Sequence, residues 1–180
     1  AIFEDRRAEP AALAEAYITE AVPDTKAALE GARDIIAERF SENAELLGKL
    51  RAYMKERAVL RSRVVAGKEQ EGAKFSDYFD HFEKWATVPS HRALAMLRGR
   101  NEDFLTLDIE VDADDTSPIK PAARMIAAAF GIGSALPGDK WLLEVASWTW
   151  RIKLSMSLSL ALMSDLRERA DEEAIRVFAR

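Results

Sequence analysis

The chain has 180 residues, 26 basic and 31 acidic side chains, and therefore a net charge of −5. With 48% hydrophobic residues and no apolar run near the ~18 residues of a membrane span, it predicts a globular chain, neither disordered nor membrane-spanning. The acidic balance argues against a strongly basic nucleic-acid binder, and the lack of cysteine excludes disulfides and cysteine-ligated zinc and fits a cytoplasmic location.

The first part of the chain predicts three helices. Glu9–Val22 forms the first, with its apolar residues at helical spacing. Asp24 caps a second helix over Thr25–Phe40, and Ser41 caps a third that ends near Glu56.

Two later segments predict strands. Val59–Val65 is rich in β-branched residues, and in an extended chain Arg61 and Arg63 share one face of it. Leu105–Val111 alternates strictly between apolar and polar residues. We expect the two segments to pair as a small ribbon.

The segment between these strands predicts two more helices. Phe75–Trp85 has aromatic residues at spacings of three, one, three and three, which favours a helix with its aromatic face in the core. Ser90 is expected to cap a following helix, His91–Arg98, which Gly99 closes.

The acidic segment Asp112–Pro121 predicts a loop and a boundary between two lobes, 1–111 and 112–180. Helix resumes over Ile119–Phe130 and again from Pro137. Within the last tract, Leu154–Leu162 alternates like a strand, but its Ala- and Leu-rich flanks favour helix. The fold class predicted is mainly α, a multi-helix bundle or array with at most a small two-stranded β ribbon.

The window from Lys49 to Lys74 holds eight basic and three acidic residues, a local charge of +5 in an acidic chain. A basic stripe of this kind is able to bind phosphates without any special spacing, because affinity for duplex comes largely from displaced counterions. A solvated face, or contact with an acidic neighbouring domain, explains the same charges. The candidate nucleic-acid-binding residues are Arg51, Lys55, Arg61, Arg63, Lys68 and Lys74.

Signals for catalysis or metal binding are weak. Asp77 and His81 have the four-residue spacing that places two ligands on one helix face, but no second His joins them, which favours a surface ion pair. Ser90 beside His91 lacks the flanking glycines of a nucleophile elbow. We therefore expect no enzyme activity, no cofactor and no catalytic metal.

Four strings of the chain are distinctive: GARDIIAE at 31–38, GKEQEGAKFSDYF at 67–79, PSHRALAMLRG at 89–99 and RADEEAIRVFA at 169–179. In this order they resemble the segments GARDI(I/L)AE, GKExEGAKxxDYF, PSHRxLAxxRG and ADEEAIxVFA of the bacterial Tex family of transcription accessory proteins. Where the family tends to carry a proline, this chain has Met156, so a break of the last helix within 154–162 stays open.

The resemblance implies a helical part of a longer protein, preceding an RNase-H-like YqgF domain and, further on, a carboxy-terminal S1 domain. The missing initiator Met and the helical pattern running to the last residue agree with that expectation. Our main hypothesis is that the fragment helps the parent protein bind nucleic acid in transcription. The alternative is a protein–protein or interdomain scaffold that positions the YqgF and S1 domains and contacts the transcription machinery. No membrane partner is expected.

Overall fold

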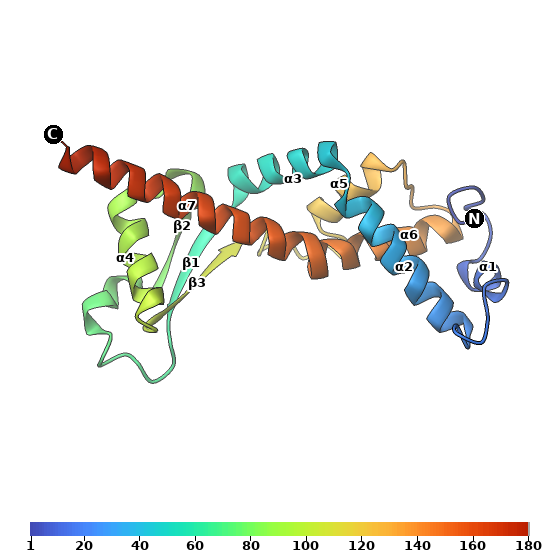
Figure 1. Cartoon of the computed structure of the whole chain (residues 1–180), viewed down its shortest axis with the longest axis horizontal. Coiled ribbons are helices and arrows are strands. Elements are labelled where there is room, and N and C mark those ends of the chain that lie inside the picture. Colours follow the sequence, from blue (N-terminus) through green and yellow to red (C-terminus); the bar gives the residue numbers. More distant parts are fainter. Residues whose placement is uncertain (180) are drawn as a thin grey trace. The chain divides into compact units, whose positions relative to one another are not determined.

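The computed structural model describes residues 1–179, and more than half of these residues are helical (Figure 1). The elements, in chain order, are α1 Pro10–Glu15, α2 Thr25–Ser41, α3 Ala44–Arg57, β1 Val59–Val64, the 3₁₀ helix η1 Ala73–Tyr78, β2 Asp80–Lys84, the 3₁₀ helix η2 Trp85–Thr87, α4 Ser90–Asn101, β3 Leu105–Glu110, α5 Pro121–Ala129, α6 Pro137–Thr149, the π-helical η3 Trp150–Leu154 and α7 Ser155–Phe178. The mainly α class is confirmed. None of the helices in this described part is long and apolar enough to cross a membrane.

The chain forms two compact units, and each takes two separate stretches of sequence. Unit 1 comprises Ala1–Leu50 and Asp115–Met156, whereas unit 2 comprises Arg51–Asp114 and the residues from Ser157 onward. The sequence predicted a single division, between 1–111 and 112–180. The predicted loop does hold one unit boundary, between Asp114 and Asp115, but the other two lie in α3 and near the start of α7, where continuous helical patterns hide them.

Unit 1 is helical, and its core is formed mainly by α2, α5 and α6. Phe40 of α2 is fully buried and lies 4.6 Å, ring centre to ring centre, from Phe130 at the end of α5. Arg6 joins the amino-terminal segment to this core, since its Nη1 pairs with the buried Asp139 at 3.2 Å and its carbonyl accepts a hydrogen bond from the Gly138 amide.

The first predicted helix is much shorter than expected. α1 ends at Glu15, and the chain then turns between Thr19 and Val22, whose backbone amides and carbonyls bond reciprocally. Tyr17, predicted to lie on a helix, follows α1 and is 58% exposed. Asp24 caps α2 as predicted, accepting from the Ala27 amide at 2.7 Å.

Unit 2 contains a three-stranded antiparallel sheet in the order β2-β1-β3. The predicted pairing of the two strands is confirmed by β1 and β3, but the limit of two strands is wrong. The predicted helix Phe75–Trp85 is instead η1, β2 and η2, and β2 supplies the third strand. Phe82 pairs with Arg61 on the outer face of the sheet and is 65% exposed, whereas Phe75 and Trp85 are buried as expected.

Two further boundaries differ from those predicted. Gly99 does not end α4, which continues to Asn101. The glycine instead allows α4 to pack closely on β3, because a Cβ at this position would clash with the Leu105 side chain. Ser90 is the first residue of α4, and its hydroxyl bonds the Glu173 carboxylate of α7 instead of capping the helix.

The last helical tract is not interrupted between residues 154 and 162, where a helix break had stayed open. Leu154–Leu162 is helical as predicted, and Met156 lies inside α7. The irregularity precedes it, since Trp150–Leu154 forms a π-helical turn between α6 and α7.

Candidate functional site

The six predicted nucleic-acid-binding cations all lie in unit 2, and five of them face carboxylates. The ion pairs and their N···O distances are Lys55–Asp165 3.3 Å, Arg61–Asp80 2.6 Å, Arg63–Glu110 3.0 Å, Lys68–Glu71 3.1 Å and Lys74–Glu102 2.6 Å. Arg51 is the exposed exception, with no ion pair within residues 1–179. The structure therefore brings the window together with acids and leaves little unpaired positive charge on it.

The outer face of the sheet shows how this pairing arises. Arg61 and Arg63 point to one face of β1, as expected, and each meets a carboxylate from a neighbouring strand. The Arg61 guanidinium also lies 5.2 Å from the centre of the Phe82 ring. These contacts make both arginines part of the sheet's cross-strand packing.

Asp77 and His81 do not share a helix face. Asp77 lies in η1 and His81 in β2, where the His81 Nε2 is 3.0 Å from Glu83 Oε1. Across the described chain, no group of three or more His, Asp or Glu side chains gathers in a way that could hold a metal ion. The shared helix face on which the metal hypothesis rested is therefore absent.

A polar cluster lies on the less exposed face of β2, which carries His81 and Glu83. The Arg92 guanidinium of α4 donates to both oxygens of Glu83 at 2.9 Å, and this pairing holds the pKa of Glu83 below its ordinary value. Burial raises the pKa of the nearby Tyr78. Because the Glu83 carboxylate is occupied by Arg92 and His81, the cluster is arranged to dock α4 on the sheet.

A second set of contacts fixes α7 within unit 2. The Trp85 indole N–H donates to the carbonyl of Leu162 at 3.0 Å, and the Arg169 guanidinium stacks 4.7 Å from the Trp85 ring centre. Arg169 also donates to the Trp85 carbonyl at 2.7 Å. These interactions, with Leu162 and Leu166 fully buried, position the residues of α7 that follow.

Two arginines that the sequence analysis did not select stand apart from this pattern. Arg100 of α4 and Arg167 of α7 have no carboxylate within ion-pairing distance in residues 1–179, and Arg167 Nη2 reaches only Asn101 Oδ1, at 3.5 Å. Burial lowers the pKa of Arg100, and the charge of Arg167 lowers it further. The sequence did contain a signal for unpaired positive charge here, because the twelve residues of α4 include three arginines and no acidic residue.

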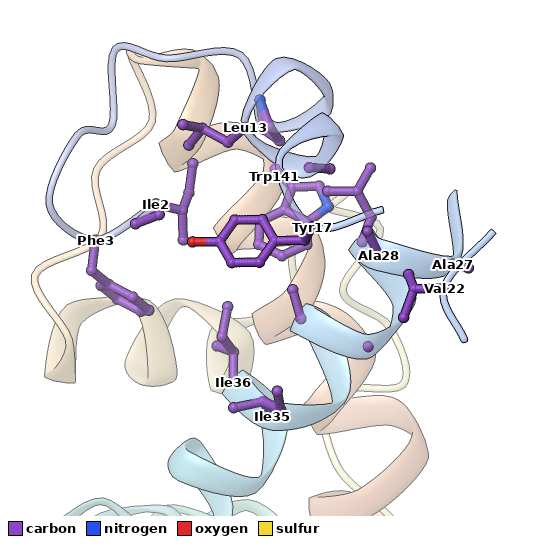
Figure 2. Close-up of a pocket in the computed structure, with 16 residues that line it drawn as sticks. Ile2, Phe3, Leu13, Tyr17, Val22, Ala27, Ala28, Ile35, Ile36 and Trp141 are labelled. Atoms are coloured by element: carbon purple, nitrogen blue, oxygen red, sulfur yellow. The ribbon is translucent and has the colours of Figure 1, made fainter. Parts of the chain in front are cut away.

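Unit 1 contains an apolar pocket of about 430 Å³, which the sequence analysis also missed (Figure 2). Small residues of α2 form one wall, and Trp141 of α6 contributes to another. The Tyr17 ring extends across the pocket with its hydroxyl toward Ile2 (Figure 2). Ile35, which also lines it, is 71% exposed. The small-residue wall, readable in the sequence, consists of Ala27, Ala28, Gly31 and Ala32.

Comparisons with known proteins agree with one another. A protein-family model described as Tex central region-like matches residues 5–178. Protein YhgF of Escherichia coli K12 is 53% identical over 175 residues, which cover 96% of this chain and 23% of that protein. The transcriptional accessory protein Tex of Neisseria gonorrhoeae is 48% identical over 172 residues, 94% of this chain and 22% of that protein.

Protein tex of Bordetella pertussis is similar at 44% identity over 188 residues, covering 99% of this chain and 24% of that protein. The chain therefore spans less than a quarter of the length of these curated relatives.

Proposed function

This chain belongs to the Tex family, and we propose that it serves a transcription accessory protein as a non-enzymatic scaffold that holds other parts of the same longer polypeptide. The name of the Neisseria gonorrhoeae relative supports the link to transcription. The ion-paired surface of unit 2 supports a structural role, because most of its predicted phosphate-binding cations are paired with carboxylates of the same unit. The YqgF and S1 domains that the family resemblance implies are the parts to be positioned.

The observation that carries this proposal is the apolar pocket of unit 1. Its lining is almost wholly apolar, yet Tyr17 and Ile35 leave much of their apolar surface to water. Exposed apolar surface of this kind marks a binding site for another chain segment. The occupant we propose is an apolar segment from elsewhere in the same polypeptide, because the curated relatives are about four times as long as this chain.

The test compares the chain alone with the full-length protein that contains it, by hydrogen exchange. In the full-length protein, amides of α2 from Ala27 to Ile36 are expected to exchange more slowly, because the occupant covers them. Ile35→Glu should remove this extra protection without changing the unfolding midpoint of the chain alone, since Ile35 is exposed.

Leu160→Glu is the matched control, because Leu160 is a similarly exposed helical residue outside the pocket. Equal exchange in the two proteins, or an equal effect of Leu160→Glu, would contradict the proposal.

A second candidate function is weak contact with nucleic acid on behalf of the parent protein. Three cations of unit 2 favour it, since Arg51, Arg100 and Arg167 have no carboxylate partner in the described part of the chain. A salt titration of binding tests it, because phosphate contact requires affinity to fall steeply as salt rises. If the chain binds no nucleic acid even at low salt, only the scaffold function remains.

A further inference from the structure

We propose that Arg100, Asn101 and Arg167 form a phosphate-binding site on unit 2, where the end of α4 meets α7. The proposal rests on the second candidate function. It places the phosphate contact at these three residues and not in the predicted basic window from Lys49 to Lys74. The shared chemistry is a phosphate oxyanion, supplied either by a nucleic-acid backbone or by free phosphate.

Both helices that carry the site are held in place by contacts outside it. On α4, Ser90 bonds Glu173 of α7 at the other end of the helix. On α7, the Trp85 indole donates to Leu162 and Arg169 donates to the Trp85 carbonyl. Because these contacts do not involve the site residues, the position of the site does not depend on its own polar groups.

The two guanidiniums lack the acidic partner that most cations of unit 2 have. Glu102, next in sequence to Asn101, is occupied by Arg98 at 2.8 Å and by Lys74 at 2.6 Å. Arg100 is half-buried, and the only charged group that acts on its pKa is Arg167, a second cation. Since arginine stays protonated at neutral pH, the two positive charges repel each other, and neither is in an ion pair with a carboxylate of the described residues.

An anion between them relieves this repulsion and satisfies unused donors. A guanidinium presents its donors as a planar fork that matches the oxygens of phosphate. Asn101 Oδ1 accepts from Arg167, which leaves the Asn101 amide N–H₂ as a third donor. By contrast, Arg61 and Arg63 must give up a carboxylate partner before they bind phosphate.

The test uses the whole chain, with Arg100→Gln, Arg167→Gln and the double variant. Lys84→Gln is the control, because Lys84 is an exposed cation of unit 2 without an acidic partner in the described residues, and it belongs neither to the site nor to the predicted window. The first probe is a fluorescein-labelled single-stranded RNA of about 12 nucleotides, followed by anisotropy from about 20 to about 200 mM salt. The second probe is inorganic phosphate, followed by the unfolding midpoint against chloride at equal ionic strength.

For a nucleic-acid source, the double variant is expected to bind RNA about tenfold more weakly than the wild type, and Lys84→Gln is expected to bind within about twofold of it. The slope of log affinity against log salt should flatten by about 0.7 for each phosphate that the variant no longer binds. For a free-phosphate source, phosphate raises the unfolding midpoint of the wild type but not of the double variant, and RNA does not bind. Either result supports the site.

Arg167→Gln keeps the test decisive if Arg100→Gln affects folding, because Arg167 is exposed. If the double variant binds RNA as well as the wild type does, or if Lys84→Gln weakens binding equally, the site is overturned and the second candidate function stands. If neither probe binds the wild type, both the site and that function fail.

Discussion

At the scale of single residues, the partners of the charged side chains explain why the basic window is not a basic surface. Arg61 pairs with Asp80, 19 positions later, and Lys55 with Asp165, 110 positions later. A charge count along the sequence omits partners that distant, and acids outnumber bases in this chain. The local charge of +5 is therefore compensated in the folded protein by carboxylates from other elements.

Gly99 shows a steric requirement at the same scale. A Cβ at this position would lie 2.4 Å from Leu105 Cδ1, whose side chain is buried. We expect Gly99→Ala to lower the free energy of unfolding by about 1–3 kcal/mol, the usual cost of overpacking a core, measured by urea denaturation.

Gly48→Ala is the control, because Gly48 lies in the helical interior of α3 with nothing within 4 Å of its Cβ position. It should raise the free energy of unfolding by about 0.5–1 kcal/mol. A Gly99→Ala protein as stable as the wild type would refute the close approach of α4 to β3.

At the scale of elements, β2 is a strand in a segment for which the sequence predicted a helix. Its sequence, DHFEK, has no β-branched residue, and its inward residues, His81 and Glu83, are polar. Aromatic residues on both sides of it happen to repeat at helical spacing. It is a strand because β1 needs a second partner for its backbone groups, and because Arg92 of α4 pairs with Glu83.

The residue that caps the start of α3 also differs from the one predicted, and this difference can be tested. Ser41, the predicted cap, lies at the end of α2 and donates to the Ala37 carbonyl at 2.7 Å. Asn43 does the capping, since its Oδ1 accepts from the Leu46 amide at 2.8 Å. Asn43→Ala should therefore lower the free energy of unfolding by about 1 kcal/mol.

Ser41→Ala serves as the comparison and should stay within about 0.5 kcal/mol of the wild type in the same denaturation measurement. The reverse order of the two effects would restore Ser41 as the cap.

At the scale of the whole molecule, the two units explain why the predicted lobes are not expected to fold separately. Unit 1 needs α5 and α6 as well as α2, and unit 2 needs α7 as well as the sheet. A cut between residues 111 and 112 removes elements from both units.

We expect the fragments 1–111 and 112–180, made separately, to lose the cooperative thermal unfolding transition of the whole chain, followed by circular dichroism. Each fragment would leave a core face exposed, because Phe40 loses Phe130, and Trp85 loses Leu162. A cooperative transition in either fragment alone would contradict this view of the units, and the intact chain is the control.

The sequence by itself determined those features that local chemistry controls. Helix-forming residues made the fold mainly α, β-branched and alternating residues identified β1 and β3, Asp24 marked the start of α2, and four local strings indicated the Tex family. Each depends on residues that are neighbours along the chain.

Only the tertiary structure decided which distant residues meet. It decided that β2 joins the sheet, that the basic window is paired with acids, that Arg100 and Arg167 are left without one, and that small residues of α2 line an apolar pocket. The physical reason is that charge compensation and packing act through space, between residues whose separation along the chain carries no local pattern.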